Sequence, residues 1–156
     1  MSGTILIAFD ESANARKAIT FVADHFTRDH GVTIFHVVPD TAAACGLNSP
    51  SLTPYFNSQR TSFCLMESQR AKIVEDMVEQ ARDLLLKAGF GKDSIQVKIQ
   101  TQDKSIASDI IQEARSGYDI VVMGRKGSPG IKEYLMGSIS QKVLNALEET
   151  SLILVE

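Results

Sequence analysis

The sequence contains no tryptophan, only four prolines and only two cysteines. Cys45 and Cys64 match neither a Cys-x-x-Cys pair nor a zinc-ligand spacing. We expect two reduced thiols, and a disulfide between them is the less favoured alternative in a reducing compartment. The uninterrupted apolar runs are far shorter than the roughly 20 residues of a membrane-spanning helix, so no membrane span is expected.

An excess of basic residues is also lacking. The formal net charge is −3 and the isoelectric point is about 5.6, which argues against a dedicated nucleic-acid-binding protein. No basic region precedes the first apolar run, which meets Asp10 after five residues, so the N-terminus does not resemble a signal peptide. We expect a cytoplasmic protein.

Several catalytic signatures are missing as well. The sequence has no GxxxxGK[ST] loop, no GxGxxG fingerprint and no GxSxG turn. Its three histidines, His25, His30 and His36, do not form a metal-ligand pattern. No residue is therefore predicted to be catalytic on the basis of a motif.

What the sequence does contain is an alternation of strands and helices in 156 residues, which is enough for one domain with its own core. Segments with apolar residues at helical spacing lie between short, continuous apolar runs. Strands separated by helices predict an α/β fold, with a parallel sheet covered by helices on both faces. The predicted strands are 5–9, 32–38, 95–99, 120–123 and 152–155. The predicted helices are one capped by Ser12, one from about Glu67 to Ala88 with Ile73, Met77, Ala81, Leu84 and Leu85 on its apolar face, one around 106–114 and one around 139–147.

Residues 40–65 have no sustained periodicity and include Pro50 and Pro54. This composition predicts a long irregular loop, which in a compact domain is usually functional or mobile.

Two of the predicted strands have features of sheet edges. Residues 95–99 alternate apolar and polar side chains and include a lysine, as exposed edge strands do. Residues 152–155 have no such protection, so if they form the other edge they should pair with a second copy in a two-fold dimer. The alternative is a central strand whose neighbours cover it.

The stretch from Gly124 to Ser140 offers the clearest functional signal. It follows the strand 120–123, leads into the last helix, and places Gly124, Gly127 and Gly137 directly before Ser138. Glycines let the backbone approach a ligand closely, and the N-terminus of a helix attracts anions. This pattern is typical of a phosphate-binding loop, and the alternative is a glycine-containing surface loop that binds nothing.

In open parallel sheets, ligands bind beyond the carboxyl ends of the strands. Asp10 follows the first strand, so it would face the glycine loop if the first and fourth strands are neighbours. Its carboxylate could hold a ribose hydroxyl, an adenine amino group or Mg²⁺, or it could help Ser12 to cap the first helix. Ser138 and Ser140 could donate to phosphate or cap the last helix. Arg125 and Lys126 could screen phosphate charge, whereas Lys132 is better explained as a solvated side chain.

From about residue 3 to 156, the sequence resembles the single-domain universal stress proteins. The matching pieces are Asp10 and Ser12 after the first strand, the FHVV strand that ends at Val38, MGRKG from Met123 to Gly127, and GSIS from Gly137 to Ser140. The resemblance implies a Rossmann-like α/β/α fold with three layers and a five-stranded parallel sheet of order 3-2-1-4-5. It also implies a homodimer through the C-terminal strand 152–155.

Because all the signature glycines are present, the resemblance implies the ATP-binding branch of the family, with ATP, ADP or AMP as ligand and Mg²⁺ at Asp10 as a possible companion. The implied nucleotide-binding residues are Ala8, Asp10, Val38, Met123, Gly124, Gly127, Gly137, Ser138, Ile139 and Ser140. The sequence departs from the family in two places. Glu11 replaces a common glycine and adds negative charge near the expected phosphates, and residues 102–104 occupy a turn that often carries glycine.

These expectations combine into an ATP-binding stress-response protein, a nucleotide-dependent sensor or switch that acts on an unidentified protein partner. One alternative is a slow ATPase or phosphotransferase, for which Asp10 is the candidate base. A second alternative is a scaffold dimer that uses no nucleotide.

Overall fold

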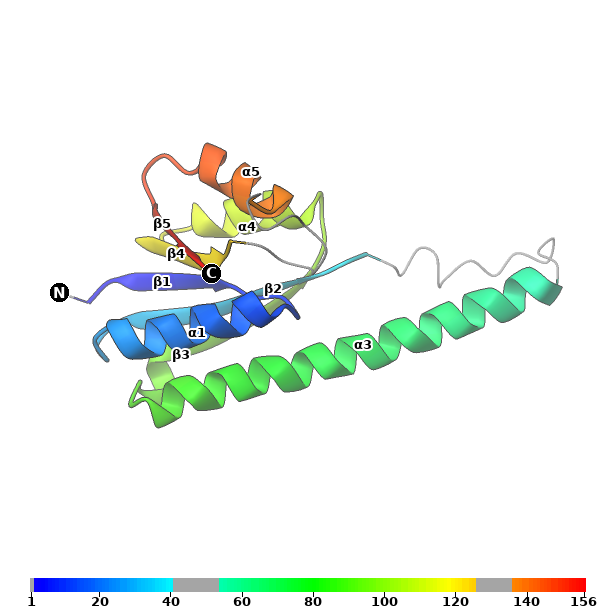
Figure 1. Cartoon of the computed structure of the whole chain (residues 1–156), viewed down its shortest axis with the longest axis horizontal. Coiled ribbons are helices and arrows are strands. Elements are labelled where there is room, and N and C mark those ends of the chain that lie inside the picture. Colours follow the sequence, from blue (N-terminus) through cyan, green and yellow to red (C-terminus); the bar gives the residue numbers. More distant parts are fainter. Residues whose placement is uncertain (1, 41–53, 126–135) are drawn as a thin grey trace.

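The computed structural model describes residues 2–40, 54–125 and 136–156, which form a parallel sheet between two layers of helices (Figure 1). The sheet has five strands in the order β3-β2-β1-β4-β5, and every neighbouring pair is parallel. The strands are β1 (Thr4–Ala8), β2 (Gly31–Val38), β3 (Ile95–Thr101), β4 (Ile120–Gly124) and β5 (Ser151–Val155). The predicted fold and strand order are therefore confirmed.

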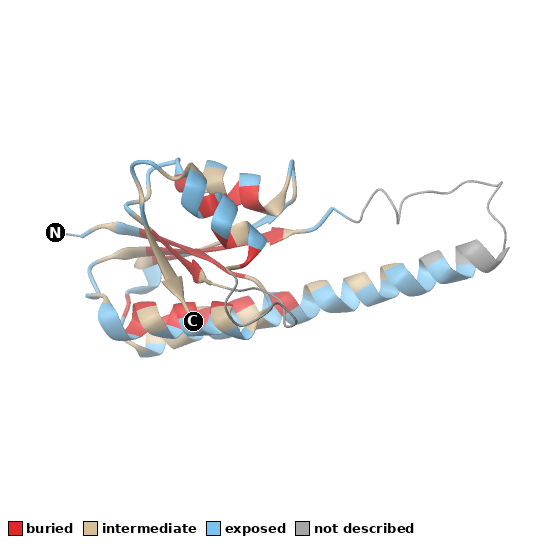
Figure 2. Ribbon diagram, turned by 45° about the horizontal axis from the view of Figure 1, so that its top comes forward, coloured by how far each residue is buried: buried red, intermediate tan, exposed pale blue. Residues whose placement is uncertain are grey.

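Helices cover both faces of the sheet (Figures 1 and 2). The helices α1 (Ala13–His25) and α3 (Pro54–Lys87) lie on one face, and α4 (Ile106–Ala114) and α5 (Ser138–Ala146) lie on the other. The short 3₁₀ helix η1 (Lys92–Ser94) leads into β3. Since β1 is central, its side chains point alternately into the two cores: Ile5 and Ile7 face α1, and Leu6 and Ala8 face the α4 side.

The first helix begins where the sequence predicts. Ser12 has an extended conformation with φ −77° and ψ 156°, and its side chain accepts a hydrogen bond from the backbone N–H of Ala15. This bond satisfies one of the N–H groups that lack a partner at the start of every α-helix.

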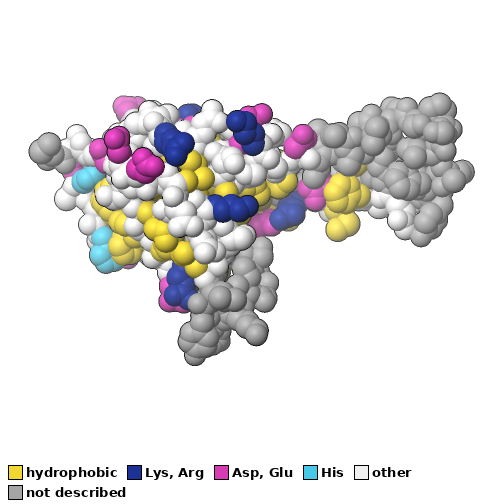
Figure 3. Space-filling view, turned by 90° about the horizontal axis from the view of Figure 1, so that it is seen from above, with side chains coloured by type: hydrophobic (Ala, Val, Ile, Leu, Met, Phe, Trp, Pro, Cys, Tyr) yellow, Lys and Arg dark blue, Asp and Glu magenta, His cyan; other side chains and the backbone are white. Residues whose placement is uncertain are grey.

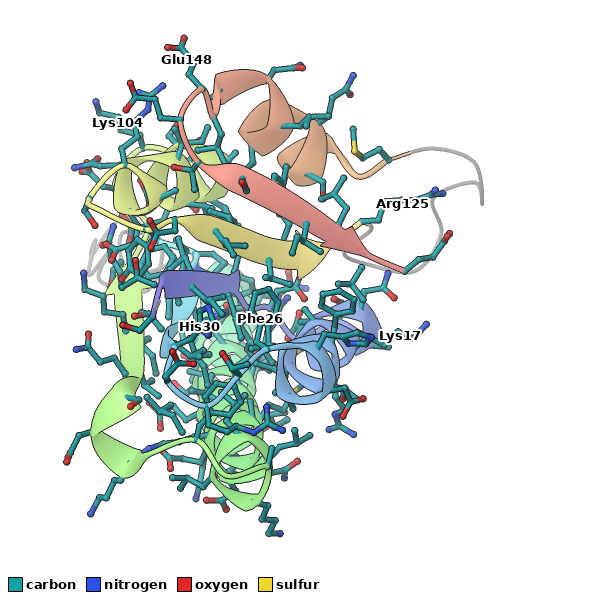
Figure 4. All side chains as sticks on the ribbon, turned by 90° about the vertical axis from the view of Figure 1, so that its left-hand side faces the viewer. Lys17, Phe26, His30, Lys104, Arg125 and Glu148 are labelled. Carbon is teal, nitrogen blue, oxygen red and sulfur yellow. The ribbon has the colours of Figure 1, made fainter. Side chains whose placement is uncertain are left out.

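Both edge strands lie where they are predicted. β3 is at one edge, where Ile99 is 45% exposed, and β5 is at the other. Figure 4 shows β5 beside β4, with no further strand beyond it. Its side chains are only partly buried: Ile153 and Val155 pack toward α1, and Leu152 and Leu154 pack toward α4 and α5.

The helix α3 begins at Pro54, not near Glu67, so residues 54–65 are helical and the predicted irregular loop is wrong for them. Residues 41–53 lie outside the described part of the chain. Proline is well suited to the first turn of a helix. The first half of α3 extends past the sheet, with Leu65 61% and Met66 67% exposed (Figures 1 and 2). Most of the described side chains from residue 58 to 65 are exposed, and an exposed helical segment needs no amphipathic period, which is why the sequence pattern missed it.

The predicted apolar face of this helix is confirmed except at one position. Ala81 and Leu85 are buried, and Met77 and Leu84 pack against the same core. Ile73 is 57% exposed, and the neighbouring Val74 is buried in its place, together with Val78. Figure 3 shows hydrophobic side chains at the surface of the body and also toward the far end of α3.

Cys64 lies on α3 and is disulfide-bonded, so the expectation of a reduced thiol is wrong for this residue. An argument from the redox compartment carries no information about which sulfur atoms lie close together. Cys45 lies outside the described residues.

Candidate functional site

A cavity of about 430 Å³ opens at the carboxyl ends of β1, β2 and β4. Its wall includes nearly all the residues that the sequence points to. These are Ala8, Asp10, Val38, Met123, Gly124, Gly137, Ser138, Ile139 and Ser140. Gly127 and the rest of 126–135 lie outside the described residues. Because β1 and β4 are hydrogen-bonded neighbours, Asp10 after β1 and Gly124 at the end of β4 line the same cavity.

One side of the cavity is apolar. Ala8, Phe35, Val37, Ile110 and Met123 line it, and all five belong to the core under α4 and α5. A flat, largely apolar group such as a heterocyclic base could be buried against these side chains without leaving polar protein atoms unpaired.

The turn after β1 is held by its own side chains. The Oδ1 atom of Asp10 accepts a hydrogen bond of 2.8 Å from the backbone N–H of Ser12, which in turn caps α1. Asp10 therefore has the capping role considered for it. It also lines the cavity, and a carboxylate has a second oxygen with which to accept a bond from a ligand.

The N-terminus of α5 is different because it has no side-chain cap. Its N-cap is Gly137, which has no side chain, and the first turn of the helix lines the cavity. The hydroxyl of Ser140 is buried and donates a hydrogen bond of 2.9 Å to the carbonyl oxygen of Gly124, so its hydrogen is committed to the protein. The backbone N–H of Gly137 donates to the carbonyl oxygen of Arg125 at 2.9 Å. These two bonds fix α5 to the end of β4 and present its positive end to the cavity.

His36 is a buried polar residue of the cavity wall that the sequence interpretation did not assign to the site. Its Nδ1 atom lies 2.8 Å from the carbonyl oxygen of Phe9. A carbonyl oxygen can only accept, so Nδ1 carries the hydrogen, and in the neutral imidazole Nε2 is an acceptor. The available signal was a histidine inside a mostly apolar strand.

The middle of α3 forms another wall that the sequence did not predict. It contributes Glu67, Arg70, Ala71, Val74 and Glu75. The guanidinium of Arg70 donates two hydrogen bonds to the carboxylate of Glu11, one of them from Nε to Oε2 at 2.9 Å. The charge that Glu11 adds beside the cavity is therefore paired. No local pattern could reveal a contact between residues 59 positions apart.

Asp109 explains the turn at 102–104 that the sequence left without an interpretation. Its carboxylate is buried and accepts hydrogen bonds from the backbone N–H groups of Asp103 at 2.8 Å and Lys104 at 3.3 Å. The Asp109 carboxylate therefore holds this turn in place. The turn leads into α4, whose Ile106 and Ile110 line the cavity.

The predicted cations lie elsewhere or outside the described residues. Arg125, labelled in Figure 4, lies near the end of β5, and its Nη2 atom is 3.3 Å from a carboxylate oxygen of Glu156. Arg125 is not among the residues that line the cavity. Lys126 and Lys132 lie outside the described residues. Within the described ranges, no three His, Cys, Asp or Glu side chains cluster as a metal site, and no helix is long and apolar enough to cross a membrane.

A comparison with protein families places this geometry in context. Residues 1–153 match the model of the universal stress protein family. The chain belongs to this family. A search of curated proteins finds no match.

Solved structures with the same fold include other universal stress proteins. UspA from Lactobacillus plantarum superposes with a TM-score of 0.71 at 18% sequence identity, over 99% of this chain and 97% of that one. The structure of the hypothetical protein MJ0577 gives a TM-score of 0.71 at 22% identity, over 99% of this chain and 96% of that one. A universal stress protein in complex with cAMP gives 0.62 at 15% identity, over 99% and 97%. At these identities the likeness establishes the shared fold.

Proposed function

We propose that this universal stress protein binds ATP and acts as a nucleotide-dependent switch in a stress response. The observation that carries the proposal is the uncapped N-terminus of α5, which opens into the cavity at the carboxyl ends of the strands. A helix end of this kind stabilises phosphate through free backbone N–H groups and the helix dipole. A solved universal stress protein in complex with cAMP, an adenine nucleotide, supports the choice of ligand class.

The cavity offers a distinct place for each part of the nucleotide. The adenine would lie against the apolar side, near Ala8, Val38 and Met123. The ribose would meet Asp10 and Gly124. The phosphates would lie at Gly137, Ser138, Ile139 and Ser140, with Gly127 as a further predicted contact. Since the hydroxyl of Ser140 donates to Gly124, this residue would contact phosphate through its backbone N–H.

Mg²⁺ would enter with the phosphates. Asp10 is the carboxylate that could reach it, and Mg²⁺ commonly combines one or two carboxylates with phosphate oxygens and water. As a switch, the protein would need a ligand that binds two conformations with different affinity. The nucleotide would contact β1, β4 and α5 at the same time. A change in the relative positions of these elements would alter the surface that the protein partner binds.

The first test is the substitution Gly137→Val. Gly137 has φ −59° and ψ 148°, a conformation that any L-residue can adopt, so the backbone need not change. Valine adds bulk at the N-cap of α5, where the first turn of the helix lines the cavity. We expect isothermal titration with Mg-ATP to show at least a tenfold loss of affinity, with a far-UV circular dichroism spectrum like that of the wild type.

The matched control is Gly31→Val at the start of β2, at the opposite end of the sheet. There an added Cβ meets nothing closer than 3.8 Å, and β-branched residues suit strands. Gly31→Val should bind ATP as the wild type does. Wild-type affinity in folded Gly137→Val, or the absence of any nucleotide binding by the wild type, would refute the proposal.

Measuring phosphate release by the wild-type protein and by Asp10→Ala distinguishes a binding protein from a slow ATPase. Phosphate release that Asp10→Ala abolishes while ATP still binds would favour the enzyme. We expect release no faster than in protein-free buffer, because phosphoryl transfer needs a positioned base and usually a metal, and among the described residues no three His, Cys, Asp or Glu side chains cluster to hold one.

A further inference from the structure

The middle of α3 forms a wall of the cavity although this helix is far in sequence from the glycine loop. Glu67, Arg70, Ala71 and Val74 repeat at spacings of three and four residues, so they share one face of the helix. In Figure 1, α3 runs past the carboxyl ends of β1 and β2, which is why this face reaches the cavity.

The charges on the described residues of the cavity wall are unbalanced. Four carboxylates line it, those of Asp10, Glu11, Glu67 and Glu75, and among the described lining residues Arg70 is the sole lysine or arginine. A ligand that carries several phosphate charges would be repelled by these carboxylates. The position of one guanidinium therefore has a large influence on which ligands the cavity accepts.

Arg70 is held by Glu11 in a two-pronged ion pair. Its Nε donates to Oε2 at 2.9 Å, and its Nη2 donates to Oε1. This hydrogen bonding lowers the pKa of Glu11 and raises the pKa of Arg70, so both groups are charged at neutral pH. The planar fork of a guanidinium fits a phosphate group as well as it fits a carboxylate.

The pair is exposed enough to exchange partners. The side chains of Arg70 and Glu11 are 53% and 38% exposed, and ion pairs with this much solvent contribute little to stability. Breaking the pair therefore costs little when another anion takes the place of the carboxylate.

We propose that Arg70 is the phosphate-recognition residue of the cavity wall and that its guanidinium leaves Glu11 to bind a phosphate group of the nucleotide. The inference rests on the proposed function. Glu11 keeps the guanidinium at the cavity while no phosphate is present and competes with the phosphate for it. Discrimination between phosphorylated and unphosphorylated ligands then depends on two residues that lie outside the glycine motif.

The test is calorimetric titration of ATP and adenosine into wild-type protein, Arg70→Gln and Glu11→Gln. For Arg70→Gln we expect the affinity for ATP to fall about tenfold or more, as loss of a hydrogen bond to a charged group does, while the affinity for adenosine stays within about twofold of the wild-type value. For Glu11→Gln we expect tighter ATP binding, because the competing carboxylate is gone, and unchanged adenosine binding.

Arg82→Gln is the matched control, since it makes the same chemical change on α3 outside the cavity wall and should leave both affinities unchanged. An equal loss of ATP and adenosine binding in Arg70→Gln would mean that the pair only holds α3 in place. Unchanged ATP affinity in Arg70→Gln, or a large loss in Glu11→Gln, would overturn the exchange while leaving the proposed function intact. A wild-type protein that binds neither ligand would overturn both proposals.

Discussion

At the scale of single residues, Asp119 joins the strands at the end of the sheet away from the cavity. Its Oδ2 atom accepts hydrogen bonds from the backbone N–H of Thr4 at 2.7 Å and from the Thr4 hydroxyl at 3.0 Å. Its backbone carbonyl accepts from the N–H of Ser151 at 3.0 Å. One residue thus connects the starts of β1 and β5 through the residue that precedes β4.

These hydrogen bonds make part of the stability depend on pH. The bonds from Thr4 lower the pKa of Asp119 below its ordinary value of 3.8. A carboxyl group with a lower pKa in the folded state stabilises that state above the unfolded pKa and loses the effect as the pH falls through the folded pKa. We expect Asp119→Asn to lower the urea midpoint at pH 7, and the gap to the wild type to shrink below about pH 4.

The matched substitution Asp83→Asn changes an exposed residue near the C-terminal end of α3. It should leave the urea midpoint unchanged at both pH values. A gap between Asp119→Asn and the wild type that is constant from pH 7 to pH 3 would show that the carboxylate charge is not involved.

At the scale of secondary-structure elements, the sequence was informative wherever a pattern is local. The cap at Ser12, the apolar runs of the central strands and the polar alternation of β3 each depend on neighbours a few positions away. The same holds for the glycines that end β4 and begin α5. Most of the fold and one half of the cavity could therefore be predicted.

The other half of the cavity depends on contacts between distant segments. Arg70 reaches Glu11 across 59 positions, and His36 bonds to Phe9 across 27. Where α3 begins, and which of its faces is buried, depend on where the helix packs. Ile73 and Val74 are adjacent apolar residues, so the sequence pattern alone cannot show which of the two faces the core. Such features become visible only once the chain is folded.

The corrected face of α3 can be tested with two substitutions. Val78 is 1% exposed and Ile73 is 57% exposed. Val78→Ala should lower the free energy of unfolding by about 2 kcal/mol, because it leaves a cavity in the core. Ile73→Ala should change it by less than about 0.5 kcal/mol. Urea titrations followed by circular dichroism measure both, and equal losses would indicate that the face centred on Ile73 is buried after all.

At the scale of the whole molecule, the edge formed by β5 determines how copies would associate. β5 pairs with β4 on one side, and its other side is the edge of the sheet (Figure 4). Four consecutive apolar side chains, Leu152 to Val155, are each only partly buried there. We predict a two-fold dimer through β5, because an unprotected edge is best satisfied by a second copy of itself.

Sedimentation velocity at micromolar concentration should therefore give twice the chain mass of 17.1 kDa. Leu154→Lys introduces a charge at this edge and should produce a folded monomer. The control Leu65→Lys makes the same change at a 61% exposed position on α3 and should remain a dimer. A monomeric wild-type protein would refute the prediction.

The strand order has a consequence for the order in which the protein is made. β1 is central, yet its partner β4 begins at Ile120, so the sheet cannot be completed until more than a hundred further residues have been synthesised. Pairing over so long a separation also slows folding. The first three strands can assemble during synthesis, but Met123 and Gly137, which line the cavity, are made late. If the proposed function holds, a nascent chain therefore cannot bind nucleotide, and nucleotide can stabilise the protein only after synthesis is nearly complete.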